Sequence, residues 1–582
     1  MSIKESTESK QPLRLNFNER SDFTSPLEQK YNFDGGIWQY PDRKPLEQLL
    51  AGRYGLKPSQ VFCTNGGDEA IMILMRILKE CSPLILPLPA FSQYVWGVES
   101  WQLEANLIEG NKDLTIDMDA TLNALRATTN SVVIITRPNN PSGELISLSN
   151  LLEIIETAKD NNSWVFLDEA YIEFSDEQSV ACSLLAQNDD PYNAQYDNLV
   201  ILRTLSKAYG LAGIRLGYLL GAEKLISEFE KRCAPFNVAT PTLNIAMEAL
   251  SKSNQEDVDN YCLTIRSNRN QLFNELKSRN INVLPSQANF LVLQLPINQS
   301  IAVESFLARN GIMVRSFCDA SLTNNLTNNM TNCLRVTIPF NMSKLSSLLK
   351  QALYPDLICL DMDGVLIDTS GSYDATVIAT VKKLSGTTIA LDDIEQLKSK
   401  GGFNNDWVLS QQLLSNLGKE YDLEEVIKVF QQIYLGENND GLVQNEQVII
   451  NQSLVKLIKD STAAITNTSF AIAFAIVTGR PLIEATAGAN FIGLEQLKLI
   501  SLDCVENAKP SPEGIKKLQD SYSAFSWMCG DNPDDMQAAN ASNSLAIGIA
   551  NEQNKQQALY LAGADFVLND INELENWLCP LK

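Results

Sequence analysis

Lys207 lies in a segment whose residue types could bind a phosphorylated aldehyde. A lysine amine condenses with an aldehyde, while hydroxyl groups and a nearby cation hold a phosphate. Such hydroxyls are present at Thr204 and Ser206, and a cation follows at Arg215. One short segment therefore offers both ends of a site for pyridoxal 5'-phosphate, with Lys207 as its catalytic amine. A lone Ser-Lys pair is common in proteins, whereas this combination is not.

The stretch from Arg203 to Tyr218 resembles the cofactor-lysine segment of the fold-type-I aminotransferases. It reads Arg-Thr-Leu-Ser-Lys-Ala-Tyr-Gly-Leu-Ala-Gly-Ile-Arg-Leu-Gly-Tyr and is most similar to that of the histidinol-phosphate aminotransferases. Other family segments follow in order along residues 12–353. The resemblance implies pyridoxal phosphate as cofactor, a large and mainly parallel-sheet domain, and a small α/β domain at about 12–45 and 240–353.

A carboxylate at the end of an apolar strand fits the ring of the same cofactor. Asp168 follows the strand-like run 164–167, where its carboxylate could keep the pyridine nitrogen protonated and make the ring a better electron sink. The resemblance places Tyr171 against the ring hydroxyl and Asn140 on the other side of it. Taken alone, the segment around Asn140 could be a plain Asn-Pro turn.

A helix start and a further tyrosine are expected at the cofactor phosphate. Gly67 and Asp68 belong to an Asn-Gly-Gly-Asp-Glu turn before the apolar helix 70–78. The free backbone N–H groups of such a helix start favour phosphate. The resemblance adds Tyr40, in Tyr-Pro-Asp, as a residue that reaches the phosphate from a second subunit, which implies a homodimer.

The resemblance also assigns an aromatic neighbour and the substrate contacts. Tyr94 matches the residue that stacks on the cofactor ring, although a tyrosine at this position could equally belong to the core. Arg335 matches the arginine that holds the amino-acid carboxylate, or its substitute, in a bidentate fork. Arg315 matches the arginine that meets the distal group of the substrate.

The chain departs from the family pattern near its start. Where the family reads Leu-Asn-x-Asn-Glu-Asn-Pro-Tyr-Gly, residues 15–23 read Leu-Asn-Phe-Asn-Glu-Arg-Ser-Asp-Phe. Asp22 therefore replaces a tyrosine that helps to hold the substrate phosphate, and a carboxylate there would repel phosphate. Arg20 could compensate or could select a different substrate, so this segment argues against histidinol phosphate.

Two aspartates lie two positions apart after a second apolar strand, 357–360. The run Asp361-Met-Asp363-Gly-Val resembles the first motif of the haloacid-dehalogenase-like (HAD) phosphatases. Asp361 would attack phosphorus to form an aspartyl phosphate, and Asp363 would protonate the leaving oxygen and then activate water. Crowded carboxylates are costly unless a cation neutralises them, which predicts Mg²⁺.

The remaining motifs of that family follow in order. Thr478, in Val-Thr-Gly-Arg, would hydrogen-bond the phosphoryl group, and Lys509, in Ala-Lys-Pro, would neutralise it. Asp531 lies in Gly-Asp-Asn-Pro-Asp-Asp and would bind the ion directly, with support from Asp535. The expected metal ligands are therefore Asp361, Asp363, Asp531 and Asp535. The helical stretch of about 373–460 lies where the family carries a cap over its substrate.

Alternating strands and helices must position both sites. Runs such as 131–136 and 164–167 alternate with helical patterns, which indicates a parallel sheet. The pattern restarts at 357 after Tyr-Pro-Asp, so we predict an aminotransferase at 1–353 and a HAD-like hydrolase at 354–582. The predicted fold class is α/β: a fold-type-I aminotransferase followed by a Rossmann-like HAD domain with a helical cap.

Composition restricts partners and catalysts. A formal net charge of −24 over 582 residues argues against nucleic acid and anionic membranes as partners. No apolar run is long enough to span a bilayer, and the first residues lack a signal-peptide core, which favours the cytoplasm. Histidine is absent, so catalysis must depend on Lys, Asp, Tyr or Arg.

The two sites together predict a bifunctional enzyme for small molecules. One site would transaminate histidinol phosphate with 2-oxoglutarate, and the other would hydrolyse a phosphate monoester that could again be histidinol phosphate. Histidine synthesis transaminates and then dephosphorylates one intermediate, so the two activities would be consecutive there. The alternatives are an aminotransferase for an aromatic or other amino acid or a phosphoserine-type substrate, a pyridoxal decarboxylase, a phosphatase of unrelated specificity, and a module without catalysis.

Overall fold

The computed structural model describes residues 13–16, 18, 40–186, 196–317, 330–398, 403, 405–437, 440–464, 472–522 and 525–578. The chain divides into two compact units: residues 1–295 with 311–345, and residues 296–310 with 346–582. This division places helix α9 (Gln299–Arg309) and most of helix α10 (Ser343–Leu353) in the second unit, so the domain limit at 353/354 stays a prediction. Among the described residues, no helix has both the length and the apolar character that crossing a membrane requires.

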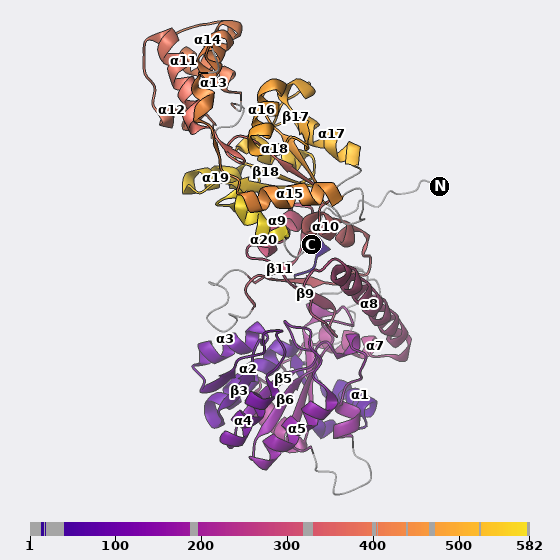
Figure 1. The fold of residues 1–582 in the computed structure, drawn as a ribbon. Helices are drawn as coiled ribbons and strands as arrows, with labels where there is room; N and C mark the ends of the chain where they lie inside the picture. Colours follow the sequence, from indigo (N-terminus) through magenta and orange to yellow (C-terminus); the bar gives the residue numbers. More distant parts are fainter. Residues whose placement is uncertain are drawn as a thin grey trace, which may run out of the picture. The chain divides into compact units, whose positions relative to one another are not determined.

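A seven-stranded sheet forms the centre of the first unit, in the order β2-β8-β7-β6-β5-β3-β4 (Figure 1). Its strands are β2 (Val61–Asn65), β3 (Leu84–Pro87), β4 (Ala105–Ile108), β5 (Val132–Thr136), β6 (Trp164–Asp168), β7 (Leu199–Thr204) and β8 (Leu216–Gly221). Strand β8 is antiparallel to β2 and β7, and the other neighbouring pairs are parallel. The mainly parallel sheet predicted from the sequence is therefore confirmed.

Helices α2 (Gly66–Cys81), α3 (Ser92–Trp101), α4 (Met118–Ala127) and α5 (Leu148–Asp160) separate the strands from β2 to β6 along the chain. Helix α1 (Lys44–Tyr54) precedes the sheet, and α6 (Glu223–Arg232), α7 (Thr240–Ala249) and α8 (Lys252–Ser278) follow β8. In α2, the apolar side chains of Ala70, Leu74 and Leu78 recur every four residues and share one core with Phe166 and Leu202 of the sheet. Burying a large apolar side chain contributes about 1.5–3 kcal/mol, which fixes α2 on the sheet.

The carboxyl ends of several strands meet at one edge of this sheet. Strands β5, β6 and β7 are parallel neighbours and end at Thr136, Asp168 and Thr204. Strand β2 is antiparallel to β8 and hence parallel to β7, so it also ends at this edge, at Asn65, where α2 begins with Gly66. In open parallel sheets, ligands bind at this edge.

Two small sheets also belong to the first unit. Strands β9 (Phe290–Gln294), β11 (Arg315–Ser316) and β12 (Cys333–Thr337) form an antiparallel sheet in the order β11-β12-β9. Strand β1 (Leu13–Arg14) pairs in parallel with β10 (Ile312–Met313). The register of β11 and β12 places Arg315 opposite Arg335.

A six-stranded parallel sheet forms the centre of the second unit, in the order β17-β16-β13-β18-β19-β20. Its strands are β13 (Leu357–Leu360), β16 (Ala473–Val477), β17 (Lys498–Ile500), β18 (Ser526–Gly530), β19 (Leu545–Ile549) and β20 (Phe566–Leu568). The helices that alternate with them are α15 (Gln452–Ala464), α16 (Leu482–Ile492), α17 (Glu513–Tyr522), α18 (Pro533–Ala541), α19 (Gln553–Leu561) and α20 (Leu574–Leu578). This is the Rossmann-like arrangement predicted from the sequence.

A group of helices is inserted between β13 and β16 (Figure 1). It contains α11 (Ala375–Ser385), α12 (Leu391–Lys398), α13 (Asp406–Asn416) and α14 (Leu423–Leu435). These helices have their own apolar core, to which Val377, Leu413 and Phe430 belong. Strands β14 (Ile367–Asp368) and β15 (Gln447–Val448) pair in an antiparallel fashion at the two ends of the insertion. The structure thus agrees with the helical cap expected at about 373–460.

Candidate active sites

A cavity of about 380 Å³ lies at the strand-end edge of the large sheet. The predicted cofactor residues that line it are Gly67, Asp68, Asn140, Asp168, Tyr171, Thr204, Ser206, Lys207 and Arg215. Its other lining residues include Phe91, Gln93, Thr136 and Ala212. Side chains from five strand or helix ends thus meet around one cavity. The site residues Tyr94 and Tyr40 do not line it.

Asp168 is a buried carboxylate with two fixed hydrogen bonds. The Tyr94 hydroxyl donates to one carboxylate oxygen at 2.7 Å, and the Ala170 backbone N–H donates to the other at 3.0 Å. Burial raises the pKa of Asp168, while these hydrogen bonds and the charge of Lys207 oppose the rise. The arrangement holds the carboxylate in one orientation at the cavity wall, as a partner for a protonated ring nitrogen requires.

Tyr94 lies beneath this carboxylate rather than in the cavity. It is fully buried, and its ring packs edge-on against Phe166 with centroids 6.5 Å apart. Phe91, three residues earlier, does line the cavity. These placements favour Phe91 over Tyr94 as the aromatic side chain that faces a bound ring.

Other residues of the cavity lining offer donors for a phosphate. The first residues of α2 line it together with Ser206 and Arg215. Arg215 donates to the Asp68 carboxylate at 2.5 Å, and the Thr204 hydroxyl lies 2.8 Å from that of Ser206. A Cβ at Gly217 would lie 2.7 Å from the Gly67 backbone nitrogen, so only glycine lets β8 approach the start of α2 this closely. Helix-end N–H groups, hydroxyls and a guanidinium form a donor set that fits a phosphate.

The cavity wall beside Asp168 is linked to the small antiparallel sheet. Tyr171 accepts a hydrogen bond from the Asn18 side chain at 3.0 Å, and the Lys207 ammonium lies 5.6 Å from the centre of the Tyr171 ring. The Asn140 side-chain oxygen accepts a hydrogen bond from Arg335 at 2.6 Å. Arg335 on β12 therefore contacts a residue of the cavity wall.

Arg335 and Arg315 differ in exposure and electrostatics. Burial, together with the charge of Arg315, lowers the pKa of Arg335 to about 10, although Tyr171 opposes the shift. Arg315 is exposed. An anionic substrate group would offset the repulsion between these two cations. This fits their predicted roles in binding the carboxylate and the distal group of the substrate. The segment with Arg20 and Asp22 lies outside the described residues.

Tyr40 is 79% exposed and stacks on Phe236 with ring centroids 4.5 Å apart. Such an exposed aromatic pair is available to another molecule. Its predicted contact with the phosphate in a second subunit stays a prediction.

A second candidate site lies at the carboxyl ends of β13 and β18. Carboxylate oxygens of Asp361, Asp531 and Asp535 lie within 4.8 Å of one another. The Lys509 ammonium lies 2.9 Å from Asp361 and 2.5 Å from Asp535. Hard oxygen ligands in this arrangement fit Mg²⁺.

Electrostatics favour a cation at this second site. Burial, Asp535 and the neighbouring carboxylates raise the pKa of Asp361 well above its ordinary value, against the charge of Lys509. Burial and Asp535 likewise raise the pKa of Asp531 to about 7. One ammonium therefore does not neutralise the group, and a divalent ion would supply the missing positive charge.

Asp363 is held apart from these three carboxylates. Its side chain accepts hydrogen bonds from Arg480, with the Nε contact at 2.8 Å, and Arg480 also pairs with Glu446 at 2.8 Å. Arg480 is the last residue of the Val-Thr-Gly-Arg motif but was not among the predicted site residues, and neither was Glu446. A side-chain contact between Asp363 and a metal stays a prediction.

Thr478 and Lys509 line a cavity of about 160 Å³. Asn405, at the start of cap helix α13, lines the same cavity. A second hollow brings Asp363 and Arg480 together with Asn405, Asp406 and Trp407. The cap therefore supplies side chains to the space beside the carboxylates, as expected of an element that selects a substrate.

Substitution of Gly364 should damage the second site directly. Gly364 has a φ of +69°, and a Cβ there would lie 2.0 Å from an Asp531 carboxylate oxygen. We expect Gly364→Ala to reduce the predicted Mg²⁺-dependent hydrolysis at least about 100-fold, as loss of a positioned catalytic group does. Gly418→Ala is the matched control, because Gly418 has a similar φ of +72° but no atom within 4 Å of the added Cβ. Equal losses of hydrolysis in the two variants would mean that backbone strain, and not the clash with Asp531, causes the effect.

Family models match both units. Residues 27–350 match the family "Aminotransferase class I and II", and residues 355–543 match the family "haloacid dehalogenase-like hydrolase". The first range contains all predicted residues of the first site, from Tyr40 to Arg335, and the second contains those of the second site, from Asp361 to Asp535.

Curated relatives resemble the first of these ranges. The chain is 32% identical over 339 residues to the histidinol-phosphate aminotransferase of Pseudoalteromonas atlantica, which covers 56% of this chain and 84% of that relative. It is 33% identical over 309 residues to the putative histidine biosynthesis bifunctional protein HisCD of Photorhabdus laumondii. That match covers 52% of this chain but only 35% of the relative.

Among solved structures, the chain resembles the histidinol-phosphate aminotransferase of Clostridium acetobutylicum. The TM-score is 0.50 at 20% identity, and the match covers 58% of this chain and 97% of the other. At this identity the likeness concerns the fold, and it agrees with the fold-type-I arrangement of the first unit.

Proposed function

Since the chain belongs to the aminotransferase class I and II family, we propose that its first unit transaminates histidinol phosphate with 2-oxoglutarate. The observation that carries the proposal is the cavity in which Lys207, Asp168 and the start of α2 meet. The substrate is inferred from relatives named histidinol-phosphate aminotransferase. The exposed side chain of Tyr40, which stacks on Phe236, supports a homodimer. A cytoplasmic location is a separate part of the proposal.

Each residue of the first site has a definite task in this proposal. Pyridoxal phosphate, when bound, supplies an aldehyde and an electron-withdrawing ring. Lys207 would provide the amine that condenses with the aldehyde and later carries a proton to and from the substrate carbon. Asp168 would hold the ring nitrogen in its protonated state, and Arg215 with the start of α2 would hold the phosphate.

Arg335 and Arg315 are proposed to bind the anionic groups of the substrates. Arg335 lies 2.6 Å from Asn140 of the cavity wall and presents a guanidinium that could fork onto a carboxylate or a phosphate. Arg315 lies opposite it in the register of β11 and β12. The two cations could therefore hold the carboxylates of 2-oxoglutarate and, in the other half-reaction, the phosphate of histidinol phosphate.

We further propose that the second unit hydrolyses a phosphate monoester with Mg²⁺. Asp361 would be the nucleophile and Asp363 the acid and base. Lys509 and Thr478 would bind the phosphoryl group, and Asp531 and Asp535 would hold the ion beside Asp361. The convergence of three carboxylates and one ammonium supports this role. The natural ester would be histidinol phosphate, so that the two reactions would be consecutive steps of histidine synthesis.

The experiment that tests the first activity measures glutamate. The purified protein, loaded with pyridoxal phosphate, is incubated with histidinol phosphate and 2-oxoglutarate, and aromatic amino acids and phosphoserine are tested as competing amino donors. We expect glutamate to form fastest from histidinol phosphate. Glutamate from another donor alone would overturn the substrate, and release of carbon dioxide without glutamate would indicate a decarboxylase.

Removal of metal should separate the two activities. With EDTA, we expect phosphate release from histidinol phosphate or histidinol-like esters to stop, because Asp361, Asp531 and Asp535 would then repel each other and the substrate phosphate. Glutamate formation should continue unchanged. Added Mg²⁺ should restore phosphate release, whereas hydrolysis that persists in EDTA would contradict the proposed metal site.

A further inference from the structure

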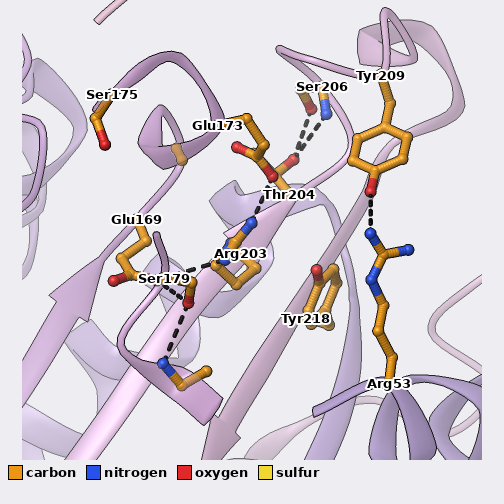
Figure 2. Close-up of polar contacts among 12 residues, drawn as sticks. Arg53, Glu169, Glu173, Ser175, Ser179, Arg203, Thr204, Ser206, Tyr209 and Tyr218 are labelled. Carbon is orange, nitrogen blue, oxygen red and sulfur yellow. Dashed lines mark hydrogen bonds and ion pairs between the residues drawn. The ribbon is translucent and has the colours of Figure 1, made fainter. Parts of the chain in front are cut away.

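Arg203 lies in a charged cluster with Glu169 and Glu173 (Figure 2). In β7, Leu202 and Thr204 line the cavity. Side chains alternate between the two faces of a strand, so Arg203, which lies between them, points to the opposite face. There it is almost fully buried and lies opposite Tyr218 of β8.

Arg203 joins two glutamates of the turn that follows β6. It donates to Glu169 at 3.4 Å and forms a closer ion pair with Glu173. Glu169 is fully buried and also accepts hydrogen bonds from the Ser179 hydroxyl and from the Val180 backbone N–H. Burial alone would lower the pKa of Arg203, but Glu173 and other neighbours raise it well above its ordinary value, so Arg203 stays charged.

Two residues that line the cofactor cavity lie next to or within this turn. Asp168 immediately precedes Glu169, and Tyr171 lies between Glu169 and Glu173; both Asp168 and Tyr171 line the cavity. The backbone of Glu169 makes a hydrogen bond to Leu202 at 3.0 Å. Arg203 adds two side-chain links between the turn at 169–173 and the strand before Lys207.

The Lys207 side of the cavity has its own anchor. Tyr209, two residues after Lys207, hydrogen-bonds Arg53 of α1 at 2.9 Å (Figure 2). The Thr204 and Ser206 hydroxyls bond to each other inside the cavity wall. The strand end with Lys207 therefore has a contact of its own. The turn with Tyr171 is held to β7 by Arg203 and by the Glu169 backbone bond, and to α8 by Arg266, which donates to the Glu173 carbonyl at 2.7 Å.

We propose that Arg203 is a positioning residue for pyridoxal phosphate, which holds the turn that carries Tyr171, directly after Asp168 at the end of β6, at a set distance from the Lys207 segment. A bound ring must contact both sides of the cavity at once. Groups around a bound molecule hold it best when their own supports are rigid. Arg203 supplies such a support on the opposite face of the sheet, through its contacts with Glu169 and Glu173. The inference rests on the cofactor of the proposed function but not on its substrate.

The test uses Arg203→Lys and Glu173→Gln in the full-length holoenzyme. Lysine keeps the charge but offers one compact ammonium in place of the guanidinium fork, so it cannot span both glutamates. Glu173→Gln removes the charge of Glu173, which is less buried than Arg203. If Arg203→Lys does not fold, Glu173→Gln alone tests the proposal. Arg126→Lys is the matched control, because Arg126 pairs with Glu153 at 4.0 Å on the surface.

The first measurement is the affinity for pyridoxal phosphate after its removal and return, followed by absorbance. We expect both variants to bind the cofactor roughly tenfold more weakly than the wild type, the size of effect that outer partners of a bound group have. The double variant should be no weaker than Arg203→Lys alone, because Glu173 acts through Arg203. Cofactor affinity within about twofold of the wild type in both folded variants would overturn the proposal.

The second measurement separates positioning from general stability. Pyridoxal phosphate raises the melting temperature of a protein that binds it, and we expect this increase to shrink in both variants. A purely structural role would lower the melting temperatures of the cofactor-free and cofactor-loaded proteins by equal amounts, and that result would also overturn the proposal. If the wild-type protein itself does not bind pyridoxal phosphate, the proposed function fails instead.

Discussion

Lys207→Ala is expected to abolish transamination and the absorbance at about 400 nm that pyridoxal phosphate shows when joined to a lysine amine. Alanine can neither condense with the aldehyde nor carry a proton, and loss of a proton-transfer group alone costs up to about 10⁴-fold in rate. Hydrolysis of phosphate esters should remain unchanged, because Asp361 and Lys509 lie in a separate compact unit. The measurements are the absorbance spectrum, glutamate formation and phosphate release.

Two control variants define what this result means. Lys224→Ala removes an exposed lysine of α6 and should leave the spectrum and both activities unchanged. Lys207→Arg keeps a positive charge in the cavity but cannot form the covalent link, so it should retain some cofactor affinity without the absorbance at about 400 nm. Absorbance that survives in Lys207→Ala would show that another amine holds the cofactor. Loss of both activities would show that the two sites are not independent.

The elements that position the two sites could be predicted from local sequence patterns. The apolar run before Asp168 forms β6, and the run before Asp361 forms β13. A carboxylate at the end of a buried parallel strand must lie at the edge where the other strands of that direction end. This topological rule brings Asp531 to the same edge as Asp361 although 170 positions separate them, and the carboxylates do converge.

The sequence alone did not show which of two aromatic side chains faces the cofactor cavity, because that depends on where helix α3 begins. Phe91 and Tyr94 are three residues apart, and either could face a cofactor ring. Helix α3 begins at Ser92, so Phe91 stays at the cavity edge while Tyr94 turns inward to the Asp168 carboxylate. A shift of one residue in the start of the helix would change which aromatic side chain faces the cavity, and composition does not set that start.

Contacts between distant charged side chains were also beyond sequence reasoning. Arg480 pairs with both Asp363 and Glu446, which belong to different parts of the chain, and no local pattern links the three. The pair of Arg203 and Glu169 left a weak signal. Arg203 lies in β7 one residue before Thr204, and Glu169 directly follows Asp168 at the end of β6, so each is adjacent to a predicted site residue, and their charges are opposite. Such alternation predicts a buried partner but does not identify it.

Asp361→Asn is expected to abolish phosphate release while leaving transamination intact. The amide keeps the size of the side chain but lacks the charge that makes the carboxylate a nucleophile. It also removes one of the three converging carboxylates and leaves Lys509 with Asp535 as its remaining carboxylate partner. We expect hydrolysis to fall about 10⁴-fold or more, toward the rate without enzyme, measured as phosphate released from histidinol phosphate with Mg²⁺.

The same substitution on the surface provides the control for this result. Asp520 is exposed on α17, and Asp520→Asn should change neither activity. Removing a buried carboxylate from a crowded acidic group relieves repulsion, so the metal-free Asp361→Asn protein should be at least as heat-stable as the wild type. A folded Asp361→Asn protein that still hydrolyses the ester at the wild-type rate would assign the nucleophile to another residue. If glutamate formation fell together with phosphate release, the two units would depend on each other.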